Sequence, residues 1–222
     1  MTIFERALDF VNDGDLIGVG SGRAAAAFTK LLGERVRAGL NVRGVPTSGA
    51  ASALMEQVGI LRGLLGEVPQ LAVDVDGADE VDPNLDLIKG YGRALVREKI
   101  VAASAKKVVI LVGANKIVPV LGSRGNLPVE VLPFALPLCM QRLRDLGLEP
   151  ILFDKDGKRF LSDNGNFILD CGVKPIARPA ALEAAIRAIP GVVGTGLFLG
   201  MADVVLIGDD QFNLTAERTR TP

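Results

Sequence analysis

Short apolar runs alternate with helically spaced apolar positions along the first half of the chain. The runs predict buried strands at 16–19, 41–45, 71–75 and 108–112. Apolar residues that recur every three or four positions predict helices over 24–36, from about 49, and over 94–105. Strands that alternate with helices pack through right-handed crossovers into a mostly parallel sheet, so we expect an α/β, Rossmann-like fold.

From residue 127 onward the pattern changes. Apolar segments predict strands at 129–132, 150–153, 166–171 and 192–197. Helical spacing predicts helices at 136–146 and 180–189. The order β-α-β-β-α-β is that of a ferredoxin-like fold, which predicts a smaller inserted α+β domain.

These patterns divide the chain into two expected domains. The Rossmann-like domain comprises residues 1–126 and 198–222, and the small domain comprises residues 127–197. An apolar run at 202–207 predicts a last strand that returns to the first sheet. The remaining tail is polar, and we expect it to be poorly ordered beyond Leu214.

The 222-residue chain contains no histidine, and this absence narrows the possible chemistry. Ser–His–Asp and Cys–His triads need an imidazole to accept the nucleophile's proton, and His-rich zinc or iron sites need it as a ligand. General acid–base catalysis must then fall to carboxylates, lysines or the single tyrosine, with pKa values tuned by their surroundings.

Charge and cysteine content exclude further classes of protein. With 25 Lys and Arg against 26 Asp and Glu, the net charge is −1, which predicts no binding to nucleic acid or to an anionic membrane. No apolar run approaches the ~20 residues of a membrane span, and we expect no signal peptide. Cys139 and Cys171 lack metal-ligand spacing, so we expect buried, inert thiols in a reducing cytoplasm.

Glycine, hydroxyl and charged residues collect where each of the first four strands ends. Ligands of open α/β sheets bind beyond these carboxyl ends, so the four segments together predict a site. The segments are 20–23, 46–49, 76–80 and, after the fourth strand, Asn115 with Lys116.

The turn at residues 20–23 leads directly into a helix that Ser21 is placed to cap. A helix N-terminus with small residues favours an anion, although a plain tight turn or part of a dinucleotide fingerprint would look similar. That fingerprint requires an acid after the next strand, where this chain has Thr47 and Ser48. Because hydroxyl groups suit a phosphate, we rank a phosphate site above a dinucleotide site.

Five carboxylates fall within residues 74–82, at positions 74, 76, 79, 80 and 82. A solvated acidic turn and a magnesium site are two simple interpretations of this segment. Asp76 and Asp79, however, follow a buried strand, and Lys89 comes a short loop later with glycines at 90 and 92. A lysine beside carboxylates, on glycines that allow close backbone approach, favours a polyhydroxylated anionic ligand.

Glu98 stands out on a helical wheel of residues 93–105. It lies among apolar residues, on the arc opposite Arg93 and Arg97. A carboxylate in apolar surroundings has a raised pKa, as a general base requires. The equal alternative is a glutamate at the rim, paired with Lys99 or with a residue across the sheet.

Taken together, these motifs resemble those of the A-type ribose-5-phosphate isomerases. The longest is VDGADEVDPNLDLIKG at residues 75–90, and LVREKIV follows at 95–101. Further matching segments, in the family's order, are 44–48, 127–131, 163–170 and 190–193. The resemblance extends from about residue 10 to residue 208.

The resemblance implies isomerisation of D-ribose 5-phosphate and D-ribulose 5-phosphate without metal or cofactor, in the non-oxidative pentose phosphate pathway. It implies a homodimer or homotetramer, with the small domain as the oligomer contact. Glu98 matches the family's proton-transferring base, and Lys89, Asp76 and Asp79 match its polar active-site residues. The implied sugar-phosphate contacts also include Ser21, Gly22, Arg23, Ala24, Thr47, Ser48, Gly77, Ala78, Gly90, Tyr91, Gly92 and Lys116.

Two segments depart from the family pattern. Where the family commonly reads Gly-Thr-Gly-Ser-Thr, residues 20–24 read Gly-Ser-Gly-Arg-Ala. Arg23 either makes a charge-assisted phosphate contact or points into solvent. The glycine-rich run after Lys89 is also altered, because Tyr91 and Arg93 interrupt it. Neither change touches Glu98, so the phosphate affinity is affected more than the reaction.

Two other classes of function fit such a fold. A non-catalytic sugar-phosphate sensor needs neither a base at position 98 nor a lysine at position 89, and it would usually carry a DNA-binding segment. CoA- or nucleotide-dependent transfer would need a ribose-binding acid. The chain has Glu98 and Lys89 and lacks the other two features, which favours the isomerase.

Overall fold

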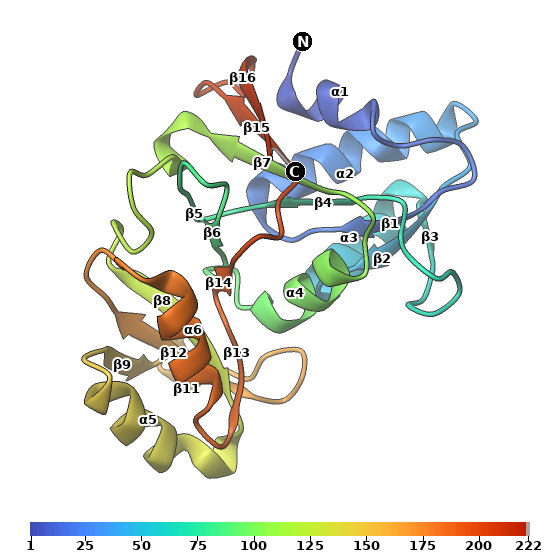
Figure 1. The fold of residues 1–222 in the computed structure, drawn as a ribbon. Coiled ribbons are helices and arrows are strands. Elements are labelled where there is room, and N and C mark those ends of the chain that lie inside the picture. Colours follow the sequence, from blue (N-terminus) through green and yellow to red (C-terminus); the bar gives the residue numbers. More distant parts are fainter. Residues whose placement is uncertain (221–222) are drawn as a thin grey trace. The chain divides into compact units, whose positions relative to one another are not determined.

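A computed structural model describes residues 1–220 of the chain, which form two compact units (Figure 1). The first unit comprises residues 1–78, 97–117 and the described residues from Gly200 onward. The second comprises residues 79–96 and 118–199.

The first unit is built on a seven-stranded sheet. Its strands are β1 (Leu16–Val19), β2 (Arg43–Pro46), β3 (Leu61–Arg62), β4 (Asp74–Gly77), β7 (Val108–Gly113), β15 (Val204–Gly208) and β16 (Leu214–Thr219). They lie in the order β16-β15-β7-β4-β1-β2-β3, and all neighbours are parallel except β15 and β16. The expected α/β, mostly parallel sheet is therefore confirmed.

Helices cover both faces of this sheet (Figure 1). They are α1 (Ile3–Leu8), α2 (Gly22–Arg37), α3 (Gly49–Val58) and α4 (Leu95–Ala103), and the short 3-10 helix η1 (Ala114–Lys116) follows β7. On one face, Phe28 of α2 and Met55 of α3 pack with the strand residues Ile17 and Val75 in the main core. On the other face, Val101 of α4 packs with strand residues such as Leu16, which alternates along β1 with Ile17 and so points the opposite way.

The strand order reverses between β1 and β4. From β1 the chain continues to β2 and β3 on one side, whereas β4, β7 and β15 extend the sheet on the other side. In open α/β sheets, ligands bind beyond the carboxyl ends of the strands at such a reversal. The segments after Val19 and around Asp76, which end β1 and β4, are therefore the place where a site is expected.

The second unit contains the predicted ferredoxin-like arrangement. Its elements are β8 (Asn126–Val131), the 3-10 helix η2 (Pro133–Ala135), α5 (Leu136–Asp145), β9 (Glu149–Leu152), β12 (Phe167–Gly172), α6 (Pro179–Arg187) and β13 (Val192–Thr195). The antiparallel sheet has the order β13-β8-β12-β9. Cys139 and Leu143 of α5 and Ile186 of α6 pack on one face of it, against Val129 and Leu169.

Two smaller antiparallel groups complete the second unit. The first joins β5 (Glu80–Val81), β6 (Leu87–Ile88) and β14 (Leu197–Phe198), and the second is a hairpin of β10 (Asp154–Lys155) and β11 (Lys158–Arg159). Because β6 pairs with β14, the segment 79–96 belongs with residues 118–199 in this compact unit. The expected small domain, residues 127–197, contains the four-stranded sheet but not the segment 79–96. The expected domain division stays a prediction.

The tail is where the sequence expectation was wrong. The edge strand β16 (Leu214–Thr219) pairs along its whole length with β15, and the last two residues of the expected disordered tail, 221 and 222, lie outside the described residues. Arg220 then donates from its main-chain N–H to the Asp203 carbonyl and from Nε to the Ala202 carbonyl. The strand forms although its side chains are polar and mostly exposed, because main-chain hydrogen bonds hold it and these need no apolar pattern. Charged side chains are also common on edge strands.

Candidate functional site

Asp76 lies at the point where the strand order reverses, at the end of β4, and it is fully buried. Its Oδ1 accepts hydrogen bonds from the main-chain N–H groups of Ser21 at 3.0 Å and Gly77 at 2.7 Å. A Cβ atom at Gly20 would lie 2.0 Å from this same oxygen. Glycine at position 20 is thus required by the Asp76 carboxylate, a constraint that the sequence motif did not reveal.

Three hydroxyl groups meet beside this carboxylate. The Ser21 Oγ lies 2.8 Å from Thr47 Oγ1 and donates to Ser48 Oγ at 2.8 Å. Thr47 and Ser48 follow β2, which neighbours β1, and the Ser48 Oγ accepts the N–H of Ala51 to cap α3. The structure therefore brings together Ser21, Thr47 and Ser48, as expected for one site.

Ser21 occupies the N-cap position of α2 but does not cap it with its side chain. Within the described residues, no first-turn amide donates to its hydroxyl, which is turned toward Thr47 and Ser48 instead. Ser21 thus stands at the N-cap as expected, but its hydroxyl does not bond the first turn of the helix. The first turn, at Gly22 and Arg23, is exposed and presents main-chain N–H groups, which favour an anion.

Two cations accompany this turn at the same edge of the sheet. Arg23 is the second residue of α2 and its side chain is exposed. Lys116 ends the 3-10 helix η1 directly after β7, the strand next to β4. Ala24, which follows Arg23, is partly exposed. Gly77 and Ala78, which follow Asp76, are partly exposed as well.

Glu98 lies on α4 with only 4% of its surface exposed. It is therefore a buried carboxylate rather than a glutamate at an exposed rim. Three residues later, Val101 packs on the sheet at Gly18, where a Cβ atom would lie 2.5 Å from Val101 Cγ1 and 2.4 Å from Asp74 Oδ1. Asp74 and Asp76 alternate with Val75, so both carboxylates face α4.

The direction of α4 places Glu98 toward the carboxyl edge of the sheet. Beyond the helix end, Ala105 forms a bridge with Leu71 just before β4, so α4 runs against the strands. Glu98 is three residues before Val101 and so lies about 4.5 Å nearer the carboxyl ends of the strands. Glu98 and Asp76 therefore share one face of the sheet and the same edge, as expected for a common site.

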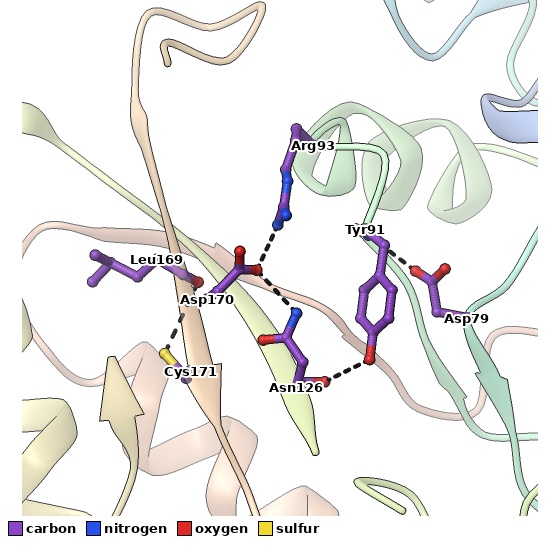
Figure 2. A network of polar contacts seen from close by, with 7 residues as sticks. All are labelled: Asp79, Tyr91, Arg93, Asn126, Leu169, Asp170 and Cys171. Carbon is purple, nitrogen blue, oxygen red and sulfur yellow. Dashed lines mark hydrogen bonds and ion pairs between the residues drawn. The ribbon is translucent and has the colours of Figure 1, made fainter. Parts of the chain in front are cut away.

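In the second unit, Lys89 and Asp79 come from the β5–β6 region (Figure 2 shows the Asp79 contact). Lys89 is only 3% exposed, and its Nζ lies 5.4 Å above the ring of Phe198. The Lys89 main-chain N–H donates to the Gly196 carbonyl at 2.9 Å. The Asp79 Oδ2 accepts the main-chain N–H of Tyr91 at 3.0 Å. The turn after Lys89 is thereby linked to Asp79.

Tyr91 and its glycine neighbours form this turn. Gly90 has φ +104°, which favours glycine, and Gly92 is exposed. The Tyr91 hydroxyl donates to the Asn126 carbonyl at 3.3 Å. Burial, followed by the charges of Glu80 and Asp79, raises the pKa of the Tyr91 phenol to about 12. Tyr91 is therefore a neutral hydroxyl at any physiological pH.

The acidic segment 74–82 is not a solvated turn, because four of its five carboxylates are buried: Asp74, Asp76, Glu80 and Asp82. Glu80 was not predicted to have a role, yet it accepts the main-chain N–H groups of Gly122 at 2.7 Å and Arg124 at 2.8 Å. Asp82 accepts the N–H groups of the turn that follows it, and its burial raises its pKa. The sequence pointed to these two residues only through their membership of the acidic segment.

Within residues 1–220, no group of three or more histidine, cysteine or acidic side chains is arranged to hold a metal ion. Over the same described range, no helix has the length and apolarity needed to cross a membrane. Cys139 and Cys171 are free and buried as expected, and burial raises the pKa of the Cys171 thiol to about 12. Both thiols are thus unreactive at neutral pH.

Known proteins similar to this chain in sequence are ribose-5-phosphate isomerases of the A type. Residues 43–211 match the family model described as "Ribose 5-phosphate isomerase A (phosphoriboisomerase A)". The chain is 50% identical over 210 residues to ribose-5-phosphate isomerase A of Gloeobacter violaceus, which covers 94% of this chain and 91% of that protein.

Solved structures agree with the sequence comparisons. Ribose 5-phosphate isomerase A of Methanocaldococcus jannaschii superposes with a TM-score of 0.92 at 38% identity, over 98% of this chain and 96% of that one. The same values hold for a D-ribose-5-phosphate isomerase structure in complex with phospho-erythronic acid.

Proposed function

Because this chain belongs to the ribose 5-phosphate isomerase A family, we propose that it interconverts D-ribose 5-phosphate and D-ribulose 5-phosphate, a step of the non-oxidative pentose phosphate pathway. One observation carries the proposal most directly: Glu98 is a buried carboxylate on the face and at the edge where Asp76 lies. In a chain without histidine, such a carboxylate is the residue type that can act as a general base.

The phosphate of the substrate binds at the start of α2 in this proposal. The uncapped first turn supplies main-chain N–H groups, and the hydroxyls of Ser21, Thr47 and Ser48 supply further donors. Arg23 and Lys116 add positive charge. Binding energy from this remote group orients the carbons that react.

Two steps, ring opening and isomerisation, then complete the reaction through proton transfers. Asp76 removes the proton of the C1 hydroxyl while the ring oxygen gains one, which opens the sugar. Glu98 removes the proton from C2 and returns it to C1, and the O2 proton passes to O1, so the aldose becomes a ketose. Each proton removed is replaced, and neither step needs a metal or a redox cofactor.

Between these transfers, negative charge develops on the carbonyl oxygen. A preorganised cation or N–H donor stabilises such an oxyanion more than it stabilises the substrate. Lys89 is the proposed donor, assisted within its turn by the main-chain N–H groups of Gly90 and Gly92, since the N–H of Tyr91 donates to Asp79. Asp79, whose Oδ2 already holds the Tyr91 N–H, fixes this donor group.

The alternative is a sugar-phosphate sensor with the same phosphate site and no turnover. A sensor would not need a buried carboxylate at position 98 or a lysine that is 3% exposed at position 89. Burying a charged group costs free energy, and the catalytic roles proposed for Glu98 and Lys89 give that burial a purpose. These two residues favour the enzyme.

An assay of ribose 5-phosphate conversion in the presence of EDTA tests the proposal. We expect ribulose 5-phosphate to form at an undiminished rate after chelation. Binding of ribose 5-phosphate without conversion would support the sensor and overturn the isomerase. Loss of conversion on chelation, restored by a divalent cation, would overturn the metal-free mechanism.

We further propose that the chain forms a homodimer or homotetramer through residues 127–197. Large apolar side chains are exposed there, including Phe134, which is 99% exposed, and Ile151. Residues 1–126 with 198–222 would carry the chemistry, and the reduced thiols suit a cytoplasmic location. Sedimentation of the wild type and of Phe134→Asp tests the contact, and a wild-type monomer would overturn it.

A further inference from the structure

The turn that follows Lys89 contains an unusual backbone conformation. Arg93 has φ +68°, in the left-handed region that glycine adopts readily and arginine does not. Gly90, three residues earlier, also has a positive φ, and its carbonyl accepts the Arg93 N–H at 2.9 Å. A non-glycine residue persists in this conformation only when the surrounding contacts hold it there.

The Arg93 side chain makes two such contacts, and Figure 2 shows the one to Asp170. Its guanidinium forms an ion pair with Asp170 Oδ1 at 2.5 Å, and the two side chains are only 16% and 25% exposed. The guanidinium carbon also lies 3.8 Å from the centroid of the Phe153 ring, close enough for a cation–π contact. A charge pair that is this well shielded is stronger than one on an open surface.

The partner Asp170 is itself held by the four-stranded sheet. It belongs to β12, and its neighbours Leu169 and Cys171 point into the core under the helices, so Asp170 points from the opposite face. Its Oδ1 also accepts the Asn126 Nδ2 at 2.9 Å. Asn126 lies on β8, which pairs with β12. The acceptor of the Arg93 charge is therefore fixed by two strands.

Tyr91 provides a second link between the turn and this sheet. Its hydroxyl donates to the carbonyl of the same Asn126, at 3.3 Å, while its main-chain N–H donates to Asp79 Oδ2 (Figure 2). The turn is thus attached to the sheet through both side chains, and its backbone is attached to Asp79. A displacement at the sheet would be passed to Asp79 and to the residue that precedes the turn, Lys89.

We propose that Arg93 and Tyr91 are positioning residues, which hold the 89–93 turn against β8 and β12 through Asp170 and Asn126 so that Lys89 and Asp79 keep one geometry during the reaction. This inference rests on the proposed isomerase function. The proposed oxyanion donors in this turn are the Lys89 side chain and the N–H groups of Gly90 and Gly92. A donor that is misplaced stabilises the transition state less, while the phosphate site in the first unit still binds the substrate.

The test uses Asp170→Asn, Arg93→Gly and the double variant in steady-state kinetics with ribose 5-phosphate. Asp170→Asn removes the charge and keeps the shape, and glycine accepts φ +68° without strain. We expect kcat to fall about 10-fold in each single variant with KM within about twofold, and the double variant to be no slower than Arg93→Gly. Arg144→Ala, at an exposed arginine of α5, is the control and should match the wild type.

Thermal unfolding separates positioning from a purely structural role. A lower melting temperature with unchanged kcat in the folded variants would overturn the proposal, and so would a rise in KM alone. If either variant fails to fold, the other decides. Tyr91→Phe, which removes one oxygen atom, decides if both fail, with an expected fall in kcat of about threefold for the loss of one neutral hydrogen bond. A wild type that does not isomerise would instead refute the proposed function.

Discussion

The main-chain N–H of Ser21 donates a hydrogen bond to Asp76 Oδ1 at 3.0 Å. This contact joins the end of β1 to the end of β4, where the strand order reverses. It holds the proposed phosphate-binding turn and the proposed ring-opening carboxylate in one arrangement. Because Gly20 leaves the space that the carboxylate fills, the turn and the acid depend on each other.

Glu98→Gln should preserve the fold and nearly abolish turnover. Glutamine has the same shape but cannot accept the C2 proton, and general-base catalysis contributes about 100- to 10,000-fold. We expect kcat to fall by at least about 100-fold with KM nearly unchanged. Glu34→Gln, at an exposed position on α2, is the matched control. Near-normal turnover in Glu98→Gln would refute the assignment of the base.

Gly20→Ala should displace Asp76. The added Cβ would lie 2.0 Å from Asp76 Oδ1, so the carboxylate must move and the hydrogen bond to Ser21 must lengthen. Overpacking of this kind costs about 1–3 kcal/mol, and we expect kcat to fall as well. At the corresponding end of β7, Gly113→Ala meets only the Asn115 side-chain oxygen at 3.1 Å and should be mild. Equal effects of the two substitutions on urea unfolding and on kcat would contradict this reasoning.

Arg23→Ala tests whether the arginine contacts the phosphate. A residue that binds the phosphate equally in the substrate and in the transition state affects KM and not kcat. We expect KM for ribose 5-phosphate to rise about 10-fold, as the loss of one charge-assisted hydrogen bond would give. Lys30→Ala, at an exposed cation on the same helix, should leave KM unchanged. An unchanged KM in Arg23→Ala would mean that the guanidinium points into solvent.

The pKa of the Tyr91 phenol should be higher in the folded protein than in the unfolded chain. The chain has one tyrosine and no tryptophan, so phenolate absorbance reports Tyr91 alone. We expect a midpoint near pH 12 in the folded state, against about 10 in denaturant. Because the folded pKa is the higher one, the stability that this group contributes is complete below pH ~10 and is lost as the pH rises toward 12. A midpoint near 10 in the folded protein would contradict the burial of the ring.

Removal of β16 should destabilise the first unit. Truncation after Asn213 deletes the partner of β15 and exposes the edge of an apolar strand. We expect a clearly lower melting temperature and concentration-dependent aggregation. Glu217→Gln, which breaks only the partly exposed pair with Arg6, should change the free energy of unfolding by at most about 1 kcal/mol. A truncated chain as stable as the wild type would show that β16 adds nothing.

The sequence by itself determined the layers of the fold and supplied the residue types on which the proposed site chemistry rests. Apolar periodicity located most strands and helices, because residues that face a core repeat with the period of their element. The missing histidine and the wheel position of Glu98 already pointed to a carboxylate base. These properties depend on residue identity and local spacing, which a sequence contains in full.

The tertiary structure decided which polar groups meet. Local rules predict that the Ser21 hydroxyl bonds the first turn of α2. The segment after the neighbouring β2 instead brings Thr47 and Ser48 within 2.8 Å of this hydroxyl, which bonds to them. Likewise β16 forms although its side chains are polar, because β15 offers it a row of main-chain donors and acceptors. The Arg93–Asp170 pair joins residues far apart in the chain. Such contacts depend on which strands become neighbours, and no local pattern contains that information.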